Sequence, residues 1–181
     1  MMNYLEIAYD IFKPYVDGEK KPLNVLEVAN LWLFLAISNN TLRNEEIAYN
    51  LAQDSELKQK LKTVKEDIHL PIAEEISRLL KEEGIPLPED TQVKPLSDFH
   101  NIPYGAKLND EEIANMMSFN LLIGVTYATR GMTEAIRADI GQLFFKVVLK
   151  KTAFGLTVKE MMRKRNWLRM APHYTDLSGG K

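Results

Sequence analysis

Apolar residues recur at intervals of three and four along most of this chain, which is the spacing of a helix with one buried face. The pattern predicts four long helices, over about 25–52, 54–83, 109–130 and 134–165, and a short amphipathic helix over about 3–13. No strand-like alternation of useful length interrupts them. The prediction is an all-α chain in which the four long helices form an antiparallel bundle around one core.

The first and third helices begin with the same signal. Asn24 and Asn109 stand just before the first periodic residues, and Glu27 and Glu112 follow three positions later. This spacing is typical of a capping box, in which asparagine and glutamate bond to each other's backbone N–H groups. Capping is therefore the expected role of both glutamates, with metal binding as the alternative.

Glycine and proline mark the other boundaries. Gly131 predicts the end of the third helix, and Thr133 is the expected cap of the fourth. Pro71 lies inside the second helix and is expected to kink it, because proline removes a backbone hydrogen bond. Residues 85–107 lack a clear periodicity, and their length suits a crossover between two helical hairpins.

The chain also matches itself weakly at an offset of 85 residues. The ten residues from Leu23 share five identities with the ten from Leu108. Further along, Phe34 meets Phe119 and Thr41 meets Thr126. A repeat of this kind predicts two related hairpins with pseudo-twofold symmetry.

The expected organisation is one bundle domain over residues 1–175, with the repeat halves at 23–84 and 108–166. The tail, 176–181, ends in Ser-Gly-Gly-Lys and is expected to be disordered.

Composition removes several classes of function. The chain has no cysteine, which excludes disulfides and thiolate chemistry, and its net charge of −2 gives no general attraction to nucleic acid. The longest apolar run, Leu31 to Ile37, is far shorter than the ~20 residues of a membrane span. The N-terminus lacks the features of a signal peptide, so we expect a soluble protein of the cytoplasm that binds neither nucleic acid nor membrane.

Charge and apolar surface both favour a homodimer. Residues 44–90 carry a balance of −6 and residues 133–170 a balance of +6. One interpretation is a basic face for an anionic partner; the favoured one is that the two helices attract each other or a second copy of the chain. Leu31–Ile37 offers more apolar surface than one face of a bundle helix needs. Either the predicted helix 3–13 covers it as a lid, or a second copy does.

Three of the helices carry part of a di-metal pattern. Such bundles use a glutamate from each of two helices and Glu-x-x-His from each of the other two. The chain offers Glu27, the pair Glu66 and His69, and Glu112, in that order. These four residues are the alternative site, which would hold iron or another divalent metal.

The fourth part of the pattern is missing. At the repeat offset, Glu66 corresponds to Lys151 and His69 to Phe154, neither of which suits a metal. His69 also follows Ile68 on the apolar stripe, so the pattern does not clearly turn it inward. The favoured prediction is therefore a bundle without a bound metal or other cofactor.

Nucleophilic catalysis finds no support in the sequence. His69, His100 and His173 have no neighbouring serine and acid arranged as in a triad, and no glycine-rich phosphate loop is present. No catalytic residue is predicted.

Three segments resemble a known family. They are the opening Leu-x-x-x-Glu-Val-Ala-x-Leu-Trp at 23–32, Leu-Leu-Lys-Glu-Glu-Gly-Ile-Pro-Leu-Pro at 79–88, and Trp-Leu-x-x-x-Pro-x-Tyr at 167–174. Together they resemble ferritin-like helical proteins of unknown function from spore-forming bacteria, which are similar to spore coat proteins of the coat F group. The resemblance implies a ferritin-like four-helix bundle and no catalytic residue.

The favoured function is a non-enzymatic structural or protein-interaction protein, located in the cytoplasm or the spore coat. Its expected partners are a second copy and other spore coat proteins. One alternative is a ferritin-like metal-binding oxidoreductase. Another is a bundle that binds a small molecule in apolar space beside Phe154 and the pair Met116 and Met117.

Overall fold

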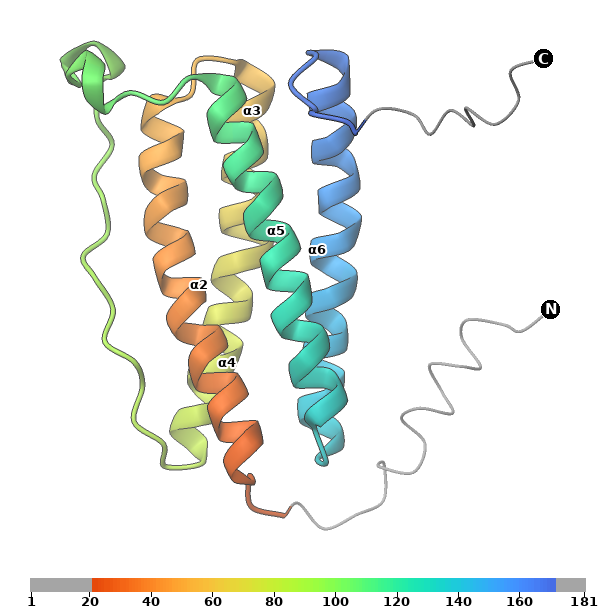
Figure 1. Cartoon of the computed structure of the whole chain (residues 1–181). Helices are drawn as coiled ribbons and strands as arrows, with labels where there is room; N and C mark the ends of the chain where they lie inside the picture. Colours follow the sequence, from red (N-terminus) through yellow and green to blue (C-terminus); the bar gives the residue numbers. More distant parts are fainter. Residues whose placement is uncertain (1–20, 172–181) are drawn as a thin grey trace, which may run out of the picture.

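The computed structural model describes residues 21–171, which form four long helical columns (Figure 1). The first, third and fourth columns are α2 (Val25–Leu51), α5 (Asp110–Glu134) and α6 (Ala138–Lys164). The second is continuous but has three parts: α3 (Ser55–Thr63), a π-helical segment (Val64–His69) and α4 (Leu70–Glu82). The described residues contain no strand, which confirms the all-α prediction. The predicted helix 3–13 and the tail 176–181 lie outside them.

The columns form two antiparallel hairpins joined by one crossover. In Figure 1, α2 and α6 run upward while α3, α4 and α5 run downward. The crossover climbs beside α2 along the full length of the bundle and contains two short 3₁₀ turns, Phe99–Asn101 and Tyr104–Ala106. One long crossover is the connection that ferritin-like folds use, and the ferritin-like relationship stays a prediction.

Hydrogen bonds hold the crossover against α2. Trp32 Nε1 donates to the carbonyl of Pro86 at 3.0 Å, and Asn50 Nδ2 donates to the carbonyl of Pro95 at 2.9 Å. Between them, the backbone N–H of Lys94 donates to Glu46 Oε2 at 2.8 Å. Because α2 packs on the bundle on one side and on the crossover on the other, part of the excess apolar surface of Leu31–Ile37 is used within the chain.

The opposite charges of the second and fourth columns are also used within the chain. Lys146 Nζ lies 2.6 Å from Glu75 Oε2, and Arg165 binds both Asp54 and Glu56 at 2.8 Å. These pairs confirm the expected attraction between the two helices. Because these charges are paired within the chain, the homodimer stays a prediction, and its interface would have to use another surface.

The third helix passes the boundary predicted for it. It continues through Gly131 to Glu134, and the hydroxyl of Thr133 donates back to the carbonyl of Thr129 at 3.0 Å rather than capping α6. A Cβ atom at Gly131 would lie 2.5 Å from the ring of Phe144. The glycine therefore permits close packing of α5 on α6 and does not end the helix.

By length and composition, α2 is apolar enough to cross a membrane. Its apolar residues Leu31, Phe34 and Leu35 lie in the core, and Phe34 meets the ring of Phe144 edge-on at 5.6 Å. Its polar residues Glu27, Arg43, Glu45 and Glu46 are buried as well. We interpret α2 as a core helix of the bundle.

Candidate functional site

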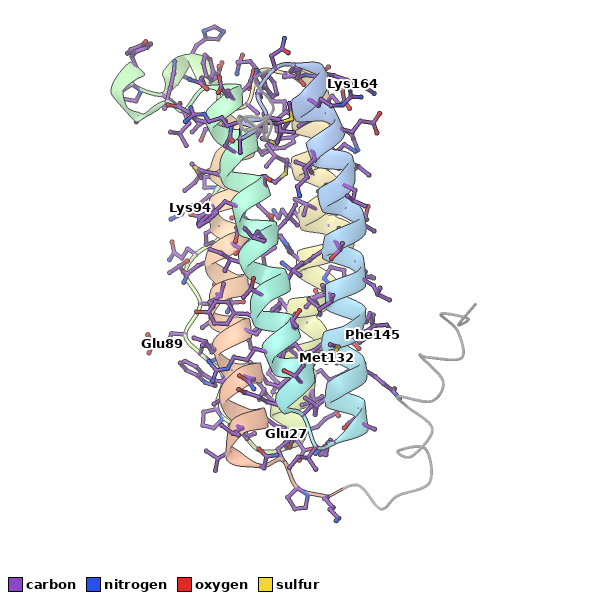
Figure 2. The ribbon with its side chains drawn as sticks, turned by 45° about the vertical axis from the view of Figure 1, so that its right-hand side comes forward. Glu27, Glu89, Lys94, Met132, Phe145 and Lys164 are labelled. Atoms are coloured by element: carbon purple, nitrogen blue, oxygen red, sulfur yellow. The ribbon has the colours of Figure 1, made fainter. Side chains whose placement is uncertain are left out.

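The four residues of the alternative metal site do not come together. Glu27 lies at the start of α2, at the end of the bundle opposite Lys164 (Figure 2). Glu112 lies in the first turn of α5, which runs in the opposite direction and therefore begins at the other end of the bundle. Glu66 is exposed on the π-helical segment. The predicted alternative set is thus not assembled.

Both terminal glutamates act as caps, as their spacing predicts. Glu27 Oε2 accepts the backbone N–H of Asn24 at 2.9 Å, and Glu112 Oε2 accepts that of Asn109 at 2.8 Å. Glu27 has a further role, because its Oε1 accepts the backbone N–H groups of Ile136 at 2.8 Å and of Arg137 at 2.7 Å. It therefore fixes the turn between α5 and α6.

His69, in contrast to the sequence expectation, points into the core. It is 2 % exposed, and its neighbour Ile68 is buried as well. The cause is the π-helical segment, in which the N–H of Leu70 bonds to the carbonyl of Lys65, five residues back. Pro71 has no N–H to continue the α-helical ladder, and the wider π turn admits an extra residue. That extra residue brings both side chains onto the inner face.

A chain of three buried polar side chains crosses the middle of the bundle. Glu45 of α2 lies 2.6 Å from His69, between Oε1 and Nδ1. On the other side of the ring, His69 Nε2 lies 2.6 Å from Nζ of Lys151 on α6. All three residues are buried, so the contacts connect three of the four columns inside the core.

The chemistry of the partners assigns the protons. A carboxylate only accepts hydrogen bonds and an ammonium only donates them. Nδ1 of His69 therefore carries the proton that it donates to Glu45, and the bare Nε2 accepts from Lys151. In this state the ring is neutral, with one negative and one positive charge on either side of it.

Burial shifts the acid–base properties of two members. Burial lowers the pKa of Lys151 to about 8, because an ammonium loses its hydration in the core. Burial lowers the pKa of His69 as well, and the charge of the adjacent Lys151 lowers it further. The imidazole therefore stays neutral at pH values where an exposed histidine would become charged.

The neighbouring helices are shaped to admit the lysine. Gly124 of α5 faces its side chain, and a Cβ atom there would lie 2.7 Å from Lys151 Nζ. On the α2 side, Nζ lies 5.8 Å from the centre of the Phe34 ring. A cation near an aromatic face is stabilised by the ring's quadrupole. The glycine and the ring make room for a charge that an ordinary apolar core would reject.

This arrangement does not suit a di-metal centre. Nε2 of His69, the nitrogen that a metal would need, is bonded to an ammonium, and that ammonium belongs to the residue at the repeat counterpart of Glu66. Among residues 21–171, no group of three or more histidines and acids is placed to hold a metal ion. In this core the lysine supplies the positive charge that balances Glu45.

Sequence reasoning found His69 and Lys151 but missed Glu45. The missed signal is its position: Glu45 follows Leu31, Leu35, Ser38 and Leu42 at helical spacing, on the buried face of α2. A glutamate on an otherwise apolar stripe destabilises the fold unless another side chain pairs with its carboxylate.

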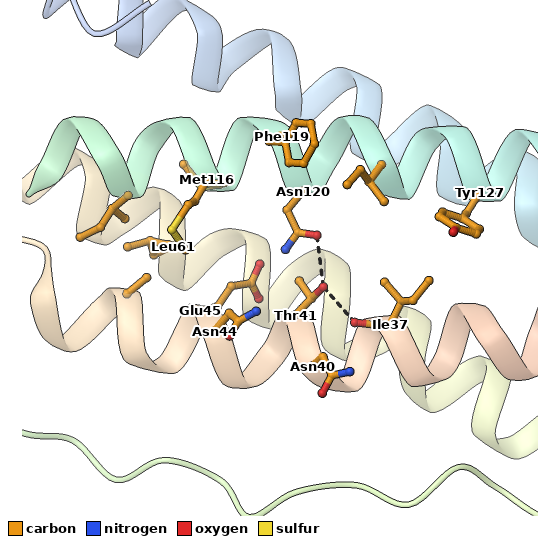
Figure 3. A pocket seen from close by; sticks show the side chains of 14 residues that line it. Ile37, Asn40, Thr41, Asn44, Glu45, Leu61, Met116, Phe119, Asn120 and Tyr127 are labelled. Atoms are coloured by element: carbon orange, nitrogen blue, oxygen red, sulfur yellow. Dashed lines mark hydrogen bonds between the residues drawn. The ribbon is translucent and has the colours of Figure 1, made fainter. Parts of the chain in front are cut away.

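An open groove lies next to this chain, between α2 and α5 (Figure 3). Its volume is about 430 Å³, and Glu45 points into it from α2 toward Met116 and Asn120 of α5. The hydroxyl of Thr41 bridges part of the groove, with its oxygen 3.3 Å from Asn120 Oδ1. Phe119 lies next to Asn120 on α5, and Tyr127 lies farther along the same helix.

Comparison with known proteins places the chain among relatives without an assigned function. The uncharacterized protein YvdQ of Bacillus subtilis (strain 168) is 27% identical over 150 residues, which cover 83% of this chain and 88% of that protein.

Two solved structures share the fold. The crystal structure of a "putative spore coat protein" from Bacillus halodurans C-125 matches with a TM-score of 0.83 and 24% identity, over 86% of this chain and 98% of that one. A conserved hypothetical protein from Mycobacterium tuberculosis matches with a TM-score of 0.63 and 13% identity, over 77% of this chain and 98% of that one.

The family evidence covers nearly the whole chain. The family described as "Protein of unknown function (DUF3231)" matches residues 12–178. From the segments at 23–32, 79–88 and 167–174 we predict membership of a family of helical proteins of unknown function. The family match confirms this prediction. The protein belongs to this family of unknown function.

Proposed function

We propose that the protein is a non-enzymatic structural protein that acts by binding other proteins, its own second copy included, and that it is associated with the spore coat. The observation that carries the proposal is a row of large apolar side chains left in solvent on α5 and α6. Phe119, Leu122 and Leu156 are exposed at 63, 61 and 62 %. We call these three residues the α5 ridge.

The α5 ridge differs from ordinary surface leucines in its arrangement. Phe119 and Leu122 are three residues apart on one helix, and Leu122 and Leu156 line the same shallow depression between α5 and α6. Single apolar residues on a surface need no explanation, but neighbouring ones often mark an interface. The crossover that covers α2 has no counterpart on this side among the described residues.

The state of the buried polar chain supports a structural role. Within the core, Nδ1 of His69 is bonded to Glu45, and Nε2 of His69 is bonded to the ammonium of Lys151. Reactive groups need access to a substrate, and these point into the bundle.

The spore association is supported by the likeness in fold to the Bacillus halodurans protein. Fluorescent fusions in a sporulating Bacillus host test it. We expect the signal to gather at the forespore surface. Uniform fluorescence throughout sporulation would contradict the proposal.

Self-association is tested by light scattering on the purified chain. The wild type should show twice the mass of 20.8 kDa, and Leu122→Asp should return the single-chain mass because it places a charge in the α5 ridge. Leu26→Asp is the matched control, since Leu26 is 53 % exposed at the start of α2. A single-chain mass for the wild type at micromolar concentration would remove the homodimer.

A further inference from the structure

One oxygen of the buried polar chain has no partner. Glu45 Oε1 is bonded to His69, but Oε2 is buried and accepts no hydrogen bond from residues 21–171. A carboxylate oxygen held away from water without a donor is costly, and native cores contain few such atoms. The position of Glu45 on the groove wall indicates where a donor could come from.

The groove offers a polar floor and apolar walls. Besides Glu45, its polar residues are Asn40, Thr41, Asn44 and Asn120, which lie toward its middle (Figure 3). The rest of the lining is aliphatic, thioether or aromatic and includes Leu61, Met116, Phe119 and Tyr127. Its volume of about 430 Å³ lies within the range of about 300–1,000 Å³ that is usual for small-molecule sites.

We propose that this groove binds a small amphiphilic amine, with its ammonium donating to Glu45 Oε2 and its apolar body lying between α2 and α5. The ligand class follows from the two halves of the site: a carboxylate that lacks a donor, and walls of aliphatic, thioether and aromatic side chains. The inference does not depend on a spore location, and it shares only Phe119 with the proposed self-association surface.

A cation suits the site better than a neutral donor. The positive charge of the buried polar chain, Lys151, lies on the far side of the His69 ring and bonds to Nε2, not to Glu45. A ligand ammonium would therefore meet the negative charge directly and the lysine only at a distance. Charge-assisted hydrogen bonds are about twice as strong as neutral ones.

The probe is 2-phenylethylamine, and 2-phenylethanol is its matched neutral control. Titration of the full chain by isothermal calorimetry and ¹⁵N-HSQC spectra should show saturable binding of the amine, with a Kd of roughly millimolar order for so small a ligand. The signals that move should belong to residues along the groove, such as Thr41, Asn120 and Tyr127. The alcohol should bind at least ~10-fold more weakly.

Two variants locate the ammonium. Glu45→Gln should weaken amine binding by ~10-fold or more, because the negative charge is gone. Since this change could also disturb the core, Met116→Lys provides the second test: it places a tethered ammonium on the groove wall and should block the amine. Met170→Lys, at an exposed methionine outside the groove, should leave binding unchanged.

Three results would overturn the inference. Equal affinity for the amine and the alcohol would show that the carboxylate plays no part. Undiminished binding to a folded Met116→Lys variant, or the lack of saturable binding to the wild type, would show that the groove is not the site. If dilution alone moved the same groove signals, the occupant would be a second copy of the chain.

Discussion

Helices α2 and α5 are the two copies of the repeat, and they begin alike but end in different surroundings. The backbone of Asn24 has φ −81° and ψ 168°, and that of Asn109 has φ −82° and ψ 168°. Thr41 and Thr126 each donate to the carbonyl four residues earlier at 3.0 Å.

The second matched pair shows the difference. Phe34 is 4 % exposed in α2, while its counterpart Phe119 is 63 % exposed in α5. The local sequence is similar in both copies, so the cause lies in what packs against each helix. Phe34 packs inside the bundle against the ring of Phe144 on α6, whereas Phe119 lies on the outside of the bundle. The contrast teaches that a repeat preserves caps and helix starts, while neighbours decide burial.

The largest test of this contrast is the pair Phe34→Ala and Phe119→Ala. The first removes a core ring that packs on Phe144 and should lower the free energy of unfolding by about 3–5 kcal/mol. The second removes an exposed ring and should change it by no more than about 0.5 kcal/mol. Urea unfolding followed by far-UV circular dichroism measures both. Equal losses would mean that the two copies share the same environment.

The second helix of each hairpin shows a similar contrast. Glu66 is exposed on the second column, whereas its counterpart Lys151 on α6 is buried. The pKa of Lys151 is about 8 in the folded protein, against about 10.4 for an ordinary lysine. Between these values the unfolded chain holds the proton and the folded chain releases it, so this group's contribution to stability rises with pH. Below pH 8 its full cost of about 3 kcal/mol is present.

The measurement is urea unfolding of the wild type and Lys151→Met at pH 7 and pH 10. The wild type should gain roughly 2–3 kcal/mol relative to the variant between the two values. Lys159→Met, at an exposed lysine of the same helix, is the control. A difference between wild type and Lys151→Met that does not move with pH would contradict the buried ammonium.

The next largest difference in stability is expected between variants of the two capping glutamates, Glu27 and Glu112. Glu27→Ala leaves three backbone N–H groups without their acceptor, those of Asn24, Ile136 and Arg137, and should cost about 2–3 kcal/mol. Glu112→Ala removes only the exposed half of a capping box and should cost about 0.5–1 kcal/mol. Thermal unfolding of both variants decides the comparison. A larger loss for Glu112→Ala would reverse the argument.

These pairs also show how far the sequence could predict the molecule. The capping boxes at Asn24 and Asn109 and the four helical columns follow from signals within a few residues, and they are found as expected. Gly131 misled because a glycine that ends a helix and one that admits a neighbouring ring look the same in a sequence.

The candidate site was only half predictable for a similar reason. The Glu-x-x-His spacing drew attention to His69, and the repeat drew attention to Lys151. Their contact depends on a π turn and on Gly124, and no local pattern predicts either. Glu45 was visible only as a charge on the buried stripe of α2, a signal that gains meaning once its partners on two other columns are known.

The smallest expected difference is between Thr41→Val and Thr126→Val. Both hydroxyls bond back to their own helix, so losing that bond should affect the two copies equally. Thr41 is also 5 % exposed and lies 3.3 Å from Asn120 Oδ1, across the groove. Its replacement should cost about 1 kcal/mol more than that of exposed Thr126, whose change should stay within about 0.5 kcal/mol. Chemical unfolding of the two variants side by side resolves this difference, and equal losses would show that the contact between α2 and α5 at Asn120 adds nothing to stability.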